Sequence, residues 1–165
     1  MTPYISIDEL KEIVKDYSVI IKIDIERHSE AALTEFCRAA TLILDTTFDF
    51  KGEKADPQQE TEFPRKDTPD LSIPRNIKLA TAYIASFVAK GDIATIVDTQ
   101  LQTNIHREKI DVLEIEYFDR TTAQGAVRKS FTEHPYLFNL IRSFLSNEFL
   151  KGQSQRPINI PLGRA

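Results

Sequence analysis

A continuous apolar stripe runs along residues 29–48, and a polar stretch that breaks regular structure follows it. The apolar positions recur at the period of an α-helix, so they would form one buried face on a single long helix. Ser29 is well placed to act as the N-cap, and Glu30 and Glu35 lie towards the positive end of the helix dipole. The stripe therefore predicts a long core helix, and its members are Leu33, Phe36, Cys37, Ala40, Ile43, Leu44 and Thr47.

Residues 49–72 are polar and contain helix- and strand-breaking residues, among them Gly52, Pro57 and Pro64. The carboxylates of Asp45, Asp49, Glu53 and Asp56 are expected to form a solvated face. Phenylalanines near both ends of the stretch can pin it to the body of the protein. A loop of this length inside a compact domain is usually functional or disordered, so we expect a long loop that is poor at burying itself.

Three further helices are predicted from spacing and from end signals. Ser6 and Glu9 form a capping box ahead of a helix over residues 7–16. Pro74 and Gly91 bracket a second helix, and Pro135 opens a third that extends to about residue 152. Residues 19–25 fit either a strand or a short helix, and we treat them as a connector whose apolar side packs on the core.

The hydrophobic period changes to two around residues 104–118. In the second arm, apolar residues at 113, 115 and 117 alternate with Glu114 and Glu116, which predicts a β-hairpin with opposite charges on facing strands. A lone hairpin is marginally stable in water, so it should pack on the helices or on a neighbouring chain.

The length of 165 residues favours one domain, and the ordinary composition favours a globular fold. We expect a mainly α fold: a small bundle of about four helices over residues 1–152, with the hairpin inserted at about 104–118. Residues 153–165 would form an extended C-terminal arm. Its alternating apolar residues suit a strand added to another protein, and a frayed terminus is an equally good interpretation.

Charge and hydropathy restrict the classes of function. The net charge of −4 argues against tight nucleic-acid binding, which relies on phosphate neutralisation. The single cysteine, Cys37, excludes an intrachain disulfide and is expected to be a small buried apolar residue. No apolar run reaches the length of a membrane span and no signal peptide opens the chain, so a cytosolic protein without membrane contact is expected.

Catalytic and metal-binding patterns are not recognisable. His28, His106 and His134 lack the spacing of metal ligands, and residues 51–54 lack the glycines of a phosphate-binding loop. The carboxylates around residue 50 lack the alternation of a calcium loop. We therefore expect no enzyme, no catalytic residue, no metal and no cofactor.

Several segments together resemble the head–tail connector, or adaptor, proteins of tailed bacteriophages. The resemblance covers about residues 30–147, and its most specific element is the Gly-x-Lys-Ala-Asp-Pro-x-Gln run at 52–59 followed by Phe63-Pro64-Arg65. Many members of this family are labelled DnaT-like single-stranded-DNA-binding proteins. The chain departs from the family in having no tryptophan, and Phe50 and Phe63 stand where the family commonly has one.

The resemblance implies a ring, typically dodecameric, beneath the portal in the neck of the virion, with the host cytoplasm as the location before assembly. Its partners would be the portal protein, copies of itself and the next neck or tail-completion protein, while DNA passes through without specific binding. The implied portal contacts are Arg156, Pro157, Ile158, Asn159, Ile160, Pro161, Leu162 and Arg164. The implied subunit interface is Ile105, Arg107, Lys109, Leu113, Glu114, Ile115, Glu116 and Tyr117, and the implied loop contacts are Lys51, Lys54, Asp56 and Arg65.

A second hypothesis follows the family label: a single-stranded-DNA-binding replication protein. Such a protein stacks bases on aromatic side chains in a basic groove and binds with a steep salt dependence. Arg65, Lys66 and Arg75 form only a modest basic cluster, and no alternation of aromatic and basic residues accompanies them.

Overall fold

The computed structural model describes residues 1–93, 96, 106–110, 113–117 and 134–154. Its α-helices in these residues are α1 (Ile7–Asp16), α2 (Glu30–Thr47), α3 (Arg75–Lys90), α5 (Pro135–Ile141) and α6 (Asn147–Ser154). Short 3₁₀ turns occur at η1 (Ile25–Arg27), η2 (Pro69–Leu71) and η4 (Arg142–Phe144). The expected mainly α fold is confirmed.

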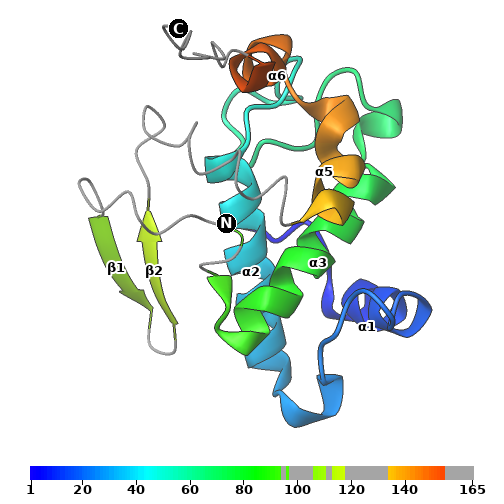
Figure 1. Ribbon diagram of the computed structural model, residues 1–165, viewed down its shortest axis with the longest axis vertical. Helices are drawn as coiled ribbons and strands as arrows, with labels where there is room; N and C mark the ends of the chain where they lie inside the picture. Colours follow the sequence, from blue (N-terminus) through cyan, green and yellow to red (C-terminus); the bar gives the residue numbers. More distant parts are fainter. Residues whose placement is uncertain (94–95, 97–105, 111–112, 118–133, 155–165) are drawn as a thin grey trace, which may run out of the picture.

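Helix α3 is the centre of the bundle (Figure 1). It contacts α1, α2 and α5, and ten of its 16 residues are buried, so nearly every side of the helix faces the core. Small residues such as Ala80, Ala82 and Ala85 line much of its surface, which lets the neighbouring helices approach closely. The core therefore forms around α3, with the predicted long helix α2 as its main partner.

The predicted stripe on α2 is confirmed, because its residues from Leu33 to Leu44 are buried. Thr47, the last member, is only half-buried. The end signals are confirmed as well: the Ser29 side chain accepts a hydrogen bond from the Ala32 amide, and Ser6 and Glu9 form the capping box of α1. Gly91 ends α3 in the left-handed conformation with φ +71°.

The predicted single helix over residues 135–152 is wrong in its continuity. The chain forms α5 and η4, becomes extended at Leu145, and restarts as α6. Two contacts with the loop explain the break: the Ser146 amide donates to the Asp49 carbonyl at 2.9 Å, and Leu145 forms a β-bridge with Phe50. The Ser146 hydroxyl then caps α6 by accepting from the Phe149 amide at 3.1 Å.

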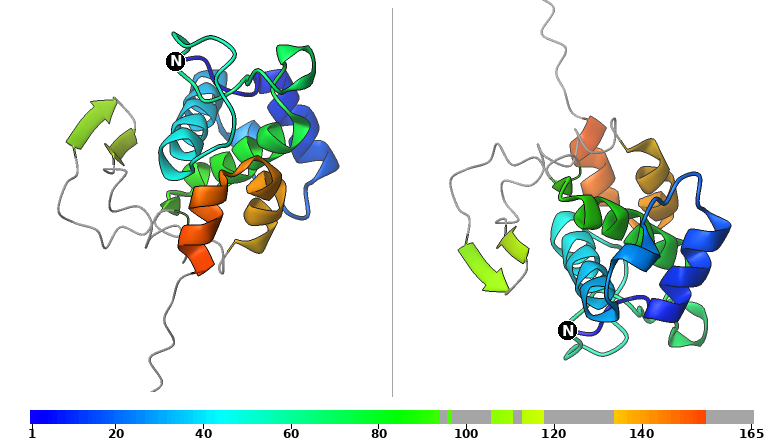
Figure 2. Two further views of the ribbon diagram at one scale, coloured as in Figure 1. Left: turned by 90° about the horizontal axis from the view of Figure 1, so that it is seen from above. Right: turned by 90° about the horizontal axis from the view of Figure 1, so that it is seen from below.

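The predicted hairpin is present in the backbone. Strand β1 (His106–Ile110) pairs antiparallel with β2 (Leu113–Tyr117), with Arg107 opposite Glu116 and Lys109 opposite Glu114. This register places opposite charges at facing positions, as the sequence predicted. Figures 1 and 2 show the two strands to one side of the helical body.

The remaining predictions concern the connector at residues 19–25, the tip of the hairpin, the loop over 120–130, the arm and the absence of a membrane span. The connector at 19–25 contains Ile21 and Ile23, which are buried as expected, and ends in the η1 turn. The tip of the hairpin, the predicted loop over 120–130 and the arm beyond residue 154 lie outside the described residues. Within those residues, no helix combines the length and the apolar character that crossing a membrane requires.

Candidate functional site

The loop of residues 49–72 carries the most specific sequence element, and aromatic side chains anchor it to the body. Phe48, Phe50 and Phe63 are all buried. The Phe63 ring centre lies 4.9 Å from that of Phe50, 5.9 Å from Tyr4 and 5.8 Å from Phe144, each in an edge-to-face arrangement. The loop is therefore packed against both ends of the described chain, which corrects the expectation that it buries itself poorly.

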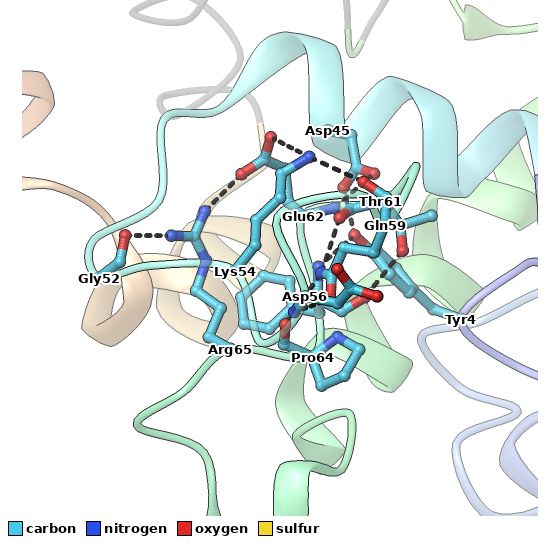
Figure 3. Close-up of polar contacts among 11 residues, drawn as sticks. Tyr4, Asp45, Gly52, Lys54, Asp56, Gln59, Thr61, Glu62, Pro64 and Arg65 are labelled. Atoms are coloured by element: carbon cyan, nitrogen blue, oxygen red, sulfur yellow. Dashed lines mark hydrogen bonds and ion pairs between the residues drawn. The ribbon is translucent and has the colours of Figure 1, made fainter.

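Arg65 closes the loop from inside. It is 4% exposed, and its Nη1 donates to the Gly52 carbonyl at 2.7 Å while Nη2 pairs with Glu62 at 2.5 Å. The guanidinium carbon lies 5.5 Å from the ring centre of Phe63 and 5.8 Å from that of Phe50. A planar guanidinium can form these hydrogen bonds and stack on rings at once, which an ammonium cannot. Figure 3 shows Arg65 between Gly52 and Glu62.

The Lys-Ala-Asp-Pro-x-Gln run forms a turn held by its own side chains. Gln59 donates to the carbonyls of Thr61 and Pro64, both at 2.9 Å, and accepts from the Asp56 amide. Lys54 Nζ lies 3.5 Å from the Glu62 carboxylate. These residues satisfy backbone groups that an irregular loop would otherwise leave unpaired, so the run stabilises the loop (Figure 3).

A contact between the buried Tyr4 and the half-buried Asp45 joins the N-terminal segment, α2 and the loop. The Tyr4 hydroxyl donates to Asp45 and accepts from the Phe63 amide at 3.0 Å. The second Asp45 oxygen accepts from the Glu62 amide at 3.1 Å. Burial raises the pKa of Asp45 to about 6 and also raises the pKa of the Tyr4 hydroxyl. Asp45 is thus a half-buried hydrogen-bond acceptor and not part of a solvated face, which corrects the sequence prediction for this residue, while Asp49, Glu53 and Asp56 are exposed as predicted.

The residues predicted as loop contacts do not share one surface. Arg65 is buried, Lys54 is half-buried against Glu62, and Lys51 and Asp56 are exposed. The structure brings Lys54 and Arg65 together, because both pair with Glu62 and form a β-bridge with each other. Sequence reasoning missed Tyr4 and Asp45, whose contact spans 41 positions and has no local signature.

The structure describes only some of the residues that were predicted for the subunit interface and the portal contact. The backbone of the interface residues within 106–110 and 113–117 is paired in the hairpin. Ile105 and all of the predicted portal contacts, from Arg156 to Arg164, lie outside the described residues. Their assignments stay predictions.

The surface offers little for stacking nucleic-acid bases in residues 1–93 and 134–150. No phenylalanine or tyrosine there is exposed, and the exposed large apolar side chains are Met1, Val19, Ile20 and Leu71. In the described part of the chain, no group of three or more potential metal-ligating side chains occurs. The contacts of Arg65 with Gly52, Glu62 and the rings of Phe50 and Phe63 are all within the loop and hold it together.

Comparison with protein families identifies the chain. A family model described as "Putative DnaT-like ssDNA binding protein" matches residues 2–165, which is nearly the entire sequence. The chain belongs to this family. The description names DNA binding and does not mention a portal, capsid or tail. Neither the comparison with curated proteins nor that with solved structures gave a match.

Membership of the DnaT-like family agrees with the label that the sequence resemblance carries. The match includes the Gly52–Arg65 loop element, for which the structure gives a structural role through Arg65 and Gln59. A family motif can thus reflect the requirements of the fold as well as those of a binding partner.

Proposed function

We propose that this member of the DnaT-like family is a structural assembly protein, a head–tail adaptor that forms a ring beneath a phage portal. The carrying observation is the hairpin of β1 and β2, a two-stranded sheet beside the helical body (Figures 1 and 2). A two-stranded ribbon is marginal by itself and gains stability from a neighbour. A ring of identical chains supplies that neighbour through a heterologous contact.

The charge distribution also supports an adaptor. The chain has a net charge of −4, and the guanidinium of Arg65 is buried beneath the loop. An acidic ring lets DNA pass without adhering to the wall, because like charges repel. The ring would extend the DNA channel and present a docking surface to the next neck component.

A second candidate is single-stranded-DNA binding, and the family comparison favours it over the first. The family's description names this activity directly. The geometry of residues 1–93 and 134–150 favours it less, because their aromatic rings are not exposed for stacking. The two candidates predict different behaviour towards DNA and towards a portal.

One experiment separates them. Fluorescence anisotropy with a labelled oligothymidine should show no binding by the full-length chain even at about 20 mM salt, where phosphate contacts are strongest. Electron microscopy of the same preparation mixed with the cognate portal should show an added ring. Binding to the oligonucleotide that weakens steeply with salt, without a ring on the portal, would establish the second candidate in place of the first.

A further inference from the structure

A groove between α1 and the first turn of α3 is not part of the cluster described above. It encloses about 270 Å³, and α1 lies beside α3 in Figure 1. Its lining includes both charged and apolar side chains, which are those of Glu9, Glu12, Ile13, Asp16, Tyr17, Arg75, Lys78 and Leu79. The groove therefore offers both charge and apolar surface to a partner.

The two cations of the groove are already engaged. Lys78 Nζ lies 2.5 Å from Glu9, and Arg75 Nη2 donates to the Tyr17 hydroxyl at 3.3 Å. Glu12 and Asp16 are exposed and form no side-chain hydrogen bond or ion pair with any described residue. They lie four positions apart on one face of α1, so their carboxylates point to the same side. The groove as a whole thus has unused negative charge.

Two exposed apolar side chains follow shortly after the end of α1 in the chain. Val19 is 84% exposed and Ile20 is 42% exposed, and only Ser18 separates them from Tyr17, which lines the groove. The occupant that the groove favours is a segment with a cationic side chain for Glu12 and Asp16 and with apolar side chains beside it for Ile13, Tyr17 and Leu79. Arginine suits such a site best, because it pairs with a carboxylate and stacks on an aromatic ring.

The arm of this chain has that composition. Residues 153–165 contain Arg156 and Arg164, no aspartate or glutamate, and apolar residues at 158, 160 and 162 between the two arginines. The arm follows α6, which Figures 1 and 2 place away from α1 across the body. We propose that the arm of one copy binds in the α1–α3 groove of a second copy, with one of its two arginines paired to the neighbouring carboxylates of Glu12 and Asp16.

This inference rests on the proposed self-assembly and gives it a specific contact between subunits. In this inference the arm binds a neighbouring copy of the chain, whereas the sequence resemblance implied that it binds the portal. The contact is heterologous, since arm and groove are different surfaces of one chain, and such contacts can close into rings.

The test titrates a synthetic peptide of residues 153–165 into the isotope-labelled full-length chain carrying Arg156→Gln and Arg164→Gln, so that its own arm does not compete. NMR signals of Ile13, Tyr17 and Leu79 should shift on addition of the peptide. Adding Glu12→Gln and Asp16→Asn to the acceptor should weaken binding about fivefold, because both carboxylates that pair with the arginine are lost.

Matched controls change the same charge elsewhere. Glu26→Gln with Glu148→Gln alters two exposed carboxylates that do not line the groove, and peptide affinity should stay unchanged. A peptide with glutamate at 156 and 164 should bind an acceptor that carries Glu12→Lys and Asp16→Lys. Restored binding by the charge-reversed pair cannot result from misfolding of the acceptor, because a misfolded acceptor would not bind the peptide.

Three outcomes would overturn the proposal. The peptide could leave the groove signals unmoved, or bind equally well after Glu12→Gln and Asp16→Asn. The third is that the dilute wild-type chain does not bind the peptide while the variant with the changed arm does. The arm would then occupy the groove of its own chain and not that of a second copy. If the peptide fails but the protein still adds a ring to the portal, the inference falls and the proposed function stands.

Discussion

At the residue scale, Arg65 shows how a motif residue can stabilise a loop from within. Its guanidinium has hydrogen bonds to Gly52 and Glu62 and two aromatic rings beside it, and its Nε has no partner in the described residues. Replacing a buried cation with this many contacts lowers stability strongly, because the Gly52 carbonyl and the Glu62 carboxylate both lose their partner.

We expect Arg65→Lys to lower the free energy of unfolding by about 2 kcal/mol, because lysine cannot reproduce the planar fork. Urea denaturation followed by circular dichroism measures it. Arg38→Lys is the control, since Arg38 pairs with Glu35 on the exposed side of α2 and should change stability little. Equal stability of Arg65→Lys and the wild type would show that the guanidinium does not close the loop.

The raised pKa of Asp45 leads to a second prediction at the residue scale, a dependence of stability on pH. Burial raises its pKa from 3.8 to about 6, so the folded state binds the proton more tightly than the unfolded state. Its contribution to stability is therefore full at low pH and is lost as the pH rises through about 6. The wild type should gain about 2 kcal/mol relative to Asp45→Asn between about pH 7 and pH 4.5. Denaturation of both proteins at each pH tests this, and a constant difference would contradict it.

At the scale of elements, helix boundaries follow local signals until a distant segment intervenes. The caps at Ser29 and Gly91 lie where the sequence predicts them. The break before α6 does not follow from periodicity, because it depends on Asp49, which is 97 positions from Ser146. A helix continues by default, and it stops where other partners satisfy its backbone better.

Ser146→Ala should lower the free energy of unfolding by about 1 kcal/mol, since it removes the cap of α6. The variant also loses the 3.0 Å contact between the Ser146 hydroxyl and Asp49. Ser143→Ala, an exposed position in η4, is the matched control and should be neutral. Thermal melting of the two variants compares them, and the cap assignment is wrong if both behave like the wild type.

At the scale of the whole molecule, the buried core that the structure describes is built from residues that precede the arm. All of the buried apolar residues in the described part lie at or before Leu145. The bundle is therefore expected to fold independently of residues 155–165, which leaves the arm available for another chain.

Truncation after Ser154 should keep the melting temperature of the full chain, because it removes no side chain of the core that the structure describes. The same truncated protein should lose self-association in analytical ultracentrifugation if the arm connects neighbouring copies. A fall in melting temperature of several degrees would instead show that the arm belongs to the fold of its own chain.

By itself, the sequence determined the mainly α class, the positions of α1 to α3, their caps and the pairing of the hairpin. Each of these depends on spacing and end residues within one short segment. The tertiary structure decided that Arg65 is buried, that Asp45 pairs with Tyr4 and that the last helix divides at Ser146. These features bring together groups far apart in the chain, and only the folded path sets their distance and their burial.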